Sequence, residues 1–72
     1  MNEIRKIQIS TDYIKLDSFL KFTGITSTGG EGKNLVENGE IYVNNEVCFQ
    51  RGKKIYPGDE VKFEDTIFKV YK

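Results

Sequence analysis

The sequence predicts an α+β fold in which two short helices pack on a small, mainly antiparallel sheet. Apolar residues recur at helical spacing in two segments before Gly39, and beyond Gly39 their period changes to two. Glycine-containing turns separate the later segments, as they do between short strands. The chain has 72 residues, the size of one domain, so we expect a single domain over residues 1–72.

The first two elements are predicted to be a strand and a short helix. Residues 3–10 alternate between apolar and polar side chains, with one break in register. A helical stripe then begins at Leu16 and continues through Phe19 and Leu20. Gly24 is expected to end this helix, because glycine readily adopts the positive φ of a helix C-terminus.

A second helix is expected from Thr28, its N-cap, to Asn38, with Gly39 ending it. Its inward face is predicted to consist of Gly32, Leu35 and Val36. A glycine on that face lowers helix propensity by about 1 kcal/mol relative to alanine, but it would let the two helices approach closely. The two helices would form a pair similar to a helix-turn-helix.

The residues after the second helix have the pattern of a strand, a tight turn and a return strand. Residues 41–43 alternate, and the two asparagines at 44–45 suit a turn because asparagine tolerates positive φ. Val47 and Phe49 are placed on the return strand.

The last third of the chain is predicted to contain a loop, a turn and a hairpin. Residues 50–54 form a basic loop around a glycine. Proline and glycine stand together within residues 56–59, which is a strong turn signal. Residues 61–63 and 67–71 then have the pattern of the two strands of a hairpin that turns at residues 64–65.

The chain is neutral overall, with 11 Lys and Arg against 11 Asp and Glu. Neutrality argues against indiscriminate nucleic-acid binding, because non-specific binding follows positive charge. The cations of the helices and the first long loop are Lys15, Lys21, Lys33, Arg51, Lys53 and Lys54, whereas most acidic residues follow at strand ends and turns. This segregation predicts one positive face, and an ordinary mixed surface is the alternative. Asp17 and Lys21 are also spaced for an ion pair along the first helix.

The composition disfavours catalysis, metal binding and membrane insertion. Cys48 is the lone cysteine, which excludes an internal disulfide and a four-thiolate zinc site. The chain has no histidine, and Cys48 has no activating neighbour in sequence, so we expect no enzymatic activity, no metal and no cofactor. We expect no membrane partner and a cytoplasmic location, because there is no apolar run of roughly 20 residues and no signal-peptide pattern.

Three segments in this order resemble the alpha-L RNA-binding domain, the S-four type of ribosomal protein domain. They are Leu-Asp-Ser-Phe-Leu at 16–20, Gly-Glu-Ile-Tyr-Val-Asn at 39–44 and Pro-Gly-Asp at 57–59. The resemblance covers a core motif of about residues 14–61. The segments 28–30 and 51–54, together with the strand near the N-terminus, look most like the stand-alone, YaaA-like bacterial members.

The resemblance implies a non-catalytic protein that binds structured RNA, either ribosomal RNA or a ribosomal particle, through the two helices and the following loop. The RNA-binding residues that it implies are Lys15, Asp17, Lys21, Lys33, Asn44, Arg51, Lys53 and Lys54. The chain departs from the family where many members open the second helix with a Ser-Arg pair, because Thr28, Gly29 and Gly30 stand there.

The residues themselves leave several interpretations open. Amide groups at Thr28, Gly29 and Gly30 could bind a phosphate, or the glycines could simply start the helix. The cations of residues 50–54 could bind phosphate or be solvated, and Asn44 could form a turn, contact RNA or do both.

The aromatic residues are divided between core packing and base stacking. We expect Phe19, Phe63 and Phe68 in the core, whereas Phe22, Tyr42 and Tyr56 either stack on bases or pack on neighbours.

Two other functions compete with RNA binding. One is a protein-interaction adaptor that uses an exposed sheet edge, residues 3–10 or 67–71, to pair with a partner chain. The other is binding of a small phosphorylated ligand at residues 28–30.

Overall fold

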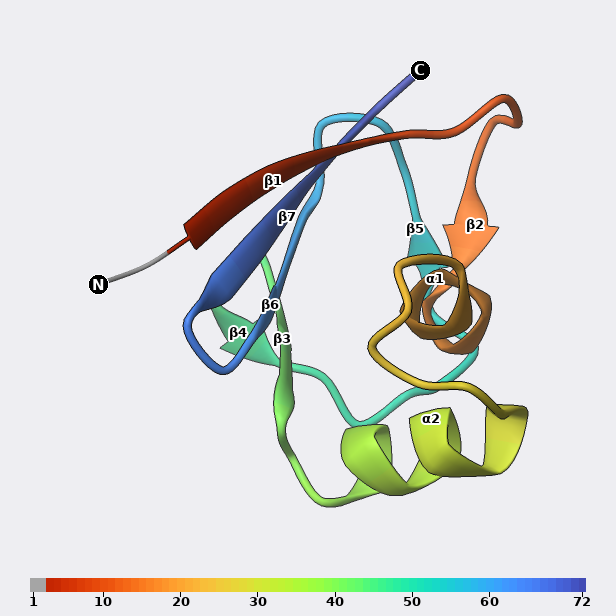
Figure 1. Cartoon of the computed structure of the whole chain (residues 1–72), viewed down its shortest axis with the longest axis vertical. Helices are drawn as coiled ribbons and strands as arrows, with labels where there is room; N and C mark the ends of the chain where they lie inside the picture. Colours follow the sequence, from red (N-terminus) through yellow and green to blue (C-terminus); the bar gives the residue numbers. More distant parts are fainter. Residues whose placement is uncertain (1–2) are drawn as a thin grey trace.

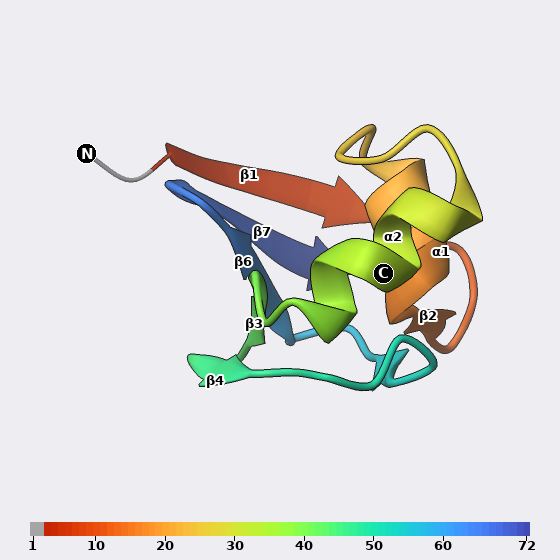
Figure 2. The same ribbon diagram turned by 90° about the horizontal axis from the view of Figure 1, so that it is seen from below.

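The computed structural model describes residues 3–72 and confirms the predicted α+β class (Figure 1). The elements in chain order are β1 (Glu3–Gln8), β2 (Ile14–Lys15), α1 (Leu16–Phe22), α2 (Gly29–Glu37), β3 (Ile41–Val43), β4 (Glu46–Val47), β5 (Lys54–Ile55), β6 (Glu60–Phe63) and β7 (Thr66–Tyr71). Both helices lie on the same side of the larger sheet (Figures 1 and 2).

Five strands form one mixed sheet in the order β1-β7-β6-β3-β4. The three pairings among β7, β6, β3 and β4 are antiparallel, as expected, whereas β1 runs parallel to β7. β7 is therefore hydrogen-bonded on both sides, and the expectation that residues 67–71 form an exposed edge is wrong. The strand near the N-terminus occupies that edge instead, so β1 and β4 are the outermost strands.

The two helices begin and end close to the residues that the sequence predicts. In α1 the side chains of Leu16, Phe19 and Leu20 are fully buried, and Gly24 follows with φ of +84°. The hydroxyl oxygen of Thr28 accepts a hydrogen bond of 3.2 Å from the Glu31 amide, which confirms the predicted N-cap of α2. Gly39 has φ of +75°, as expected after a helix C-terminus.

The hydrophobic core lies between α1, α2 and the inner face of the sheet. Phe19 meets Phe68 edge to face with ring centroids 6.0 Å apart, so both belong to the core as predicted. Phe63 is half-buried and packs against the same cluster. This packing fixes the orientation of α1 relative to the sheet, and thereby positions the segments that precede and follow the helix.

The hairpin of β3 and β4 is shorter than predicted. The asparagines at 44–45 form its turn with φ of 51° and 71°, as expected, but β4 ends at Val47. Phe49 is not on a strand. Its ring lies over Gly39, where an added Cβ would come 3.2 Å from the ring, and the Cys48 amide bonds the Ile41 carbonyl at 2.9 Å.

A two-stranded antiparallel ribbon joins β2 to β5 beside the start of α1 (Figure 1). The sequence gives no sign of this ribbon, because two-residue strands are too short for periodicity. It places Lys54, which we expected in a loop, on a strand opposite Lys15.

Candidate nucleic-acid interface

The first amides of α1 are bound by the loop that precedes β5. The Leu16 amide donates to the Lys53 carbonyl at 2.9 Å, and the Asp17 amide donates to the Arg51 carbonyl at 2.9 Å. These amides begin the helix and have no partner within it, so the loop takes the place of a capping side chain. The contact uses only the backbone of the loop, which leaves the side chains of Arg51 and Lys53 exposed to solvent.

The ribbon adds two more cations at the same place. Lys15 of β2 and Lys54 of β5 are directly opposite in the antiparallel register, and both are exposed. We call the four side chains Lys15, Arg51, Lys53 and Lys54 the basic surface. Within residues 3–72 the ion pairs are Arg5 with Glu3 and Lys72 with Asp12, so the four cations of the basic surface form no ion pair with a carboxylate of the described chain.

Two exposed tyrosines border the basic surface. The rings of Tyr13 and Tyr56 stack with centroids 5.8 Å apart, and the Lys54 Nζ lies 4.9 Å from the centroid of Tyr13. Tyr56 therefore packs on a neighbour and still exposes part of its ring. Tyr13 is not among the residues expected from the sequence, although an aromatic residue two positions before Lys15 could have drawn attention to it.

Beside these cations is a shallow depression of about 690 Å³. It is lined by Gln50, Gly52, Lys53, Lys54, Tyr56 and Asp59. The Asp59 carboxylate accepts hydrogen bonds from the Tyr56 amide at 2.8 Å and from Asn44 Nδ2 at 3.2 Å. It is thus engaged in holding the turn of residues 56–59.

Asp17 acts within its own helix. Its Oδ1 accepts a hydrogen bond of 2.8 Å from the Ser18 amide. The predicted ion pair between Asp17 and Lys21 is not formed, since neither residue belongs to an ion pair of the described chain. Lys21 lies in the last turn of α1, at the opposite end of the helix from the basic surface.

The start of α2 carries a carboxylate. Glu31 accepts hydrogen bonds from the Ser27 hydroxyl at 2.7 Å and from the Thr28 hydroxyl at 3.3 Å. These bonds, that of Ser27 foremost, lower the pKa of Glu31 below its ordinary value and keep it ionised. The amide end of α2 that includes Gly29 and Gly30 therefore already has a negative charge beside it, while Lys33 is exposed one turn further on.

Asn44 forms the turn that the sequence predicted. Its φ is 51°, and its side chain ties the β3–β4 turn to β6. Besides the bond to Asp59, Asn44 Oδ1 accepts from the Glu60 amide at 3.0 Å. Both ends of the side-chain amide are therefore used within the protein.

Comparison with known proteins decides the family. The S4 domain model matches residues 7–71, nearly the whole chain and more than the predicted core motif of 14–61. The chain belongs to the S4 domain family. This membership confirms the resemblance to the alpha-L RNA-binding domain that the sequence indicated.

Two relatives illustrate the relationship. The probable ribosome maturation protein RlbA of Bacillus subtilis (strain 168) is 40% identical over 58 residues, which are 81% of this chain and 82% of RlbA. Among solved structures, the trimeric heat shock protein 15 of Vibrio cholerae matches with a TM-score of 0.65 and 21% identity over 74% of this chain. The match covers 52% of that protein, so this S4 domain spans about half its length, and the likeness concerns the fold alone.

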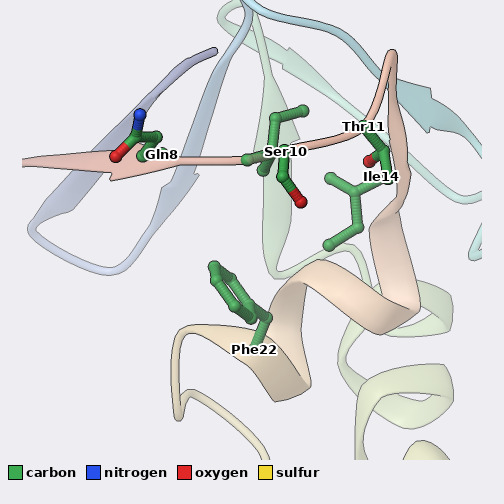
Figure 3. A pocket seen from close by; sticks show the side chains of 6 residues that line it. Gln8, Ser10, Thr11, Ile14 and Phe22 are labelled. Carbon is green, nitrogen blue, oxygen red and sulfur yellow. The ribbon is translucent and has the colours of Figure 1, made fainter.

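Other features of this S4 domain do not add to the basic surface. A pocket of about 300 Å³ between the end of β1 and α1 is lined only by uncharged residues, and the Phe22 ring points from α1 toward the end of β1 (Figure 3). Cys48 is buried, and its thiol lies 3.5 Å from the Gln50 carbonyl oxygen. Across residues 3–72 there is no cluster of three metal-ligating side chains, and no helix is long and apolar enough to cross a membrane.

Proposed function

We propose that this chain is a non-catalytic RNA-binding protein that recognises structured RNA, either ribosomal RNA or a ribosomal particle, through the basic surface. Membership of the S4 family and the similarity to a protein named for ribosome maturation support the proposal. The observation that carries it is the backbone contact between α1 and the loop. The hydrogen bonds from the Leu16 and Asp17 amides hold residues 51–54 beside Lys15, so cations from two segments that are distant in sequence lie together.

The chemistry of the basic surface suits a sugar–phosphate backbone. Arg51 can bind a phosphate through two parallel hydrogen bonds, whereas the lysines act as mobile point charges. None of these cations is paired with a carboxylate of the described chain, so each is available to an anionic ligand. The exposed parts of Tyr13 and Tyr56 could stack on an unpaired base at the margin.

In this proposal the other predicted RNA-binding residues make secondary contacts or position neighbouring segments. Lys21 and Lys33 would extend the surface along the two helices, and Asp17 would act by holding the start of α1. A phosphate at Thr28, Gly29 and Gly30 would meet the ionised Glu31, so we place the main contact at the loop. The side chain of Asn44 would position the neighbouring turn. We therefore set aside binding of a small phosphorylated ligand at residues 28–30.

The chemistry available to the chain supports a non-catalytic role. It has no histidine, and its one thiol is buried beside a carbonyl group. A ribosomal ligand would place the protein in the cytoplasm.

The test compares two double variants that remove the same charges. R51A/K53A removes one arginine and one lysine from the basic surface, and its backbone contacts to α1 stay in place. R5A/K72A removes one arginine and one lysine that already have carboxylate partners. Binding to purified ribosomal RNA is measured by filter retention over a series of KCl concentrations.

We expect R51A/K53A to bind more weakly and to lower the log–log salt slope by about 0.7–0.9 for each phosphate that is no longer neutralised. R5A/K72A should stay close to the parent chain. Equal affinity and slope in the two variants, both with parent-like melting curves, would exclude the basic surface as the RNA contact.

The protein-adaptor function is the second candidate, and the topology limits it to the edges of the sheet. β1 is an outer strand of six residues whose free edge could accept a partner strand. Arg5 and Lys6 on that strand are charges of the kind that protect an edge from pairing, which is why we prefer RNA. Pull-down from lysate with and without nuclease separates the two functions, since protein partners of an adaptor would survive the nuclease.

A further inference from the structure

The face of the sheet that points away from the helices carries its own pattern of side chains. On β3, Tyr42 stands between the buried Ile41 and Val43, so its side chain points outward. On β7, Lys69 stands between the buried Phe68 and Val70 and likewise points outward. The same alternation and the strand register define what we call the outer face, which includes Ile4, Lys6, Tyr42, Lys62, Lys69 and Tyr71.

Three lysines lie together on the outer face. Lys6 of β1 is directly opposite Lys69 of β7, and Lys62 of β6 is opposite Ile67, two residues before Lys69. Like charges directly opposite each other destabilise a sheet. Glu60 stands opposite Lys69 on β6, but neither it nor any other carboxylate of the described chain forms an ion pair with these lysines. Glu60 offsets part of this charge, and the three lysines leave a net positive patch, which an anionic ligand would stabilise.

Exposed apolar and aromatic side chains lie between these lysines. The residues Ile4, Tyr42 and Tyr71 are 57%, 42% and 44% exposed. Ile4, Ile67, Lys62 and Tyr42 are paired in turn across β1, β7, β6 and β3. Apolar side chains and one cation therefore lie in a line across the outer face. A shallow hollow of about 480 Å³ is lined by Lys6, Lys69 and Tyr71. Aromatic rings beside cations on an open sheet are the elements with which proteins bind unpaired nucleotides.

We propose that the outer face binds a single-stranded RNA segment, with bases stacked on Tyr42 and Tyr71 and phosphates held by Lys6, Lys62 and Lys69. Strand spacing and rise separate the two tyrosines by roughly 16 Å, so the ligand is a segment of several nucleotides. The basic surface lies beside the start of α1, on the helix side of the sheet. The domain would thus contact RNA through two separate faces.

Charge decides between RNA and the other possible occupants of this face. A second copy of the chain, packed face to face about a two-fold axis, would bring the three lysines against their own equivalents. An anionic ligand removes that repulsion and also the repulsion between Lys6 and Lys69 within the sheet. RNA adds a stacking partner for the tyrosines, which a simple anion lacks.

The test uses the full chain and a fluorescein-labelled twelve-nucleotide oligouridylate, whose binding is followed by fluorescence anisotropy. The variant K6Q/K62Q/K69Q removes the three charges of the outer face. The matched variant R51Q/K53Q/K54Q removes three charges from the basic surface. All six side chains lie at least partly in solvent, and thermal melts monitored by circular dichroism verify that each variant folds.

We expect K6Q/K62Q/K69Q to weaken binding of the oligouridylate at least tenfold and to reduce its salt slope by about 0.7 for each phosphate that the variant no longer neutralises. R51Q/K53Q/K54Q should weaken oligouridylate binding less than K6Q/K62Q/K69Q does, while its affinity for structured ribosomal RNA falls more. The second result tests the proposed function separately, so either proposal can fail without the other.

Photocrosslinking of a 4-thiouridine oligomer to the unaltered chain gives a measurement that needs no variant, and the crosslinks should map to Tyr42 or Tyr71. Three results would overturn the inference: unchanged oligouridylate affinity in a folded K6Q/K62Q/K69Q, crosslinks confined to Tyr13 and Tyr56, or no oligouridylate binding by the parent chain. The last result combined with a nuclease-resistant protein bound to this face would assign the face to a protein partner.

Discussion

Replacement of Gly32 by alanine should stabilise the protein, although this glycine is buried where the two helices meet. An alanine Cβ at this position would lie 3.7 Å from the Asp17 carbonyl oxygen, 3.7 Å from Leu20 Cδ1 and 3.8 Å from Thr26 Oγ1. These are ordinary van der Waals distances, so the methyl group fits without movement of either helix. The close approach that the sequence suggested therefore does not require a glycine.

The size of the effect follows from two contributions. Alanine is more favourable than glycine by about 1 kcal/mol in a helix interior. Burial of the added methyl group contributes about 0.8 kcal/mol more, an upper value because the unfolded chain already buries part of its apolar surface. We expect G32A to raise the free energy of unfolding by about 1–2 kcal/mol, and each kcal/mol corresponds to a rise in Tm of about 4–8 °C for a domain of this size.

The assay is thermal and urea unfolding followed by circular dichroism, with two companion variants. G30A places a methyl group in solvent on the same helix, within 4.0 Å only of Thr28 Oγ1, and should give a smaller rise. G32V adds more volume than the gap accepts and should lower the free energy of unfolding by about 1–3 kcal/mol. A lower Tm for G32A than for the parent chain would refute the packing argument.

Three further predictions concern single residues. T26V should raise the free energy of unfolding by about 1 kcal/mol in urea titrations, because the buried Thr26 hydroxyl has no hydrogen-bond partner within residues 3–72; a loss of stability would mean that the hydroxyl is satisfied. G39A should lower the free energy of unfolding by about 1–2 kcal/mol, since φ at this position is +75° and the new Cβ would approach the Phe49 ring to 3.2 Å. In the F49A background the same G39A substitution should cost less, because only the backbone strain remains and the contact with the ring is gone. The lowered pKa of Glu31 means that its ionised form stabilises the fold above the ordinary glutamate pKa and that this contribution disappears as the pH falls through the lowered value. E31Q should therefore flatten the fall in Tm as the pH drops below the ordinary glutamate pKa, and an unchanged profile would contradict the role of the Ser27 hydrogen bond.

Local elements of this fold could be predicted from the sequence because their causes are local. Gly24 and Gly39 end helices by adopting positive φ, and Thr28 caps α2 with its own hydroxyl. The two asparagines at 44–45 set the β3–β4 turn in the same way. The family resemblance also depended on these short-range patterns, and it was confirmed.

Contacts between distant segments could not be predicted in this way. The parallel pairing of β1 with β7 joins the two ends of the chain, and nothing in either strand indicates its partner or direction. The ribbon of β2 and β5 has two residues on each side, too few for any periodicity. The contact of the Tyr13 ring with Lys54 depends on that ribbon, which brings the two residues together.

The amino-acid sequence by itself determined where the two helices end, how α2 is capped and where the β3–β4 turn forms, since each depends on the φ preference or capping group of a few neighbouring residues. Only the tertiary structure decided which cations stand together. Carbonyl groups of Arg51 and Lys53 complete the first turn of α1 and so bring the loop to Lys15, whereas sheet register gathers Lys6, Lys62 and Lys69 on another face. The physical reason is that hydrogen bonds between backbones carry no signature of the side chains that they bring together.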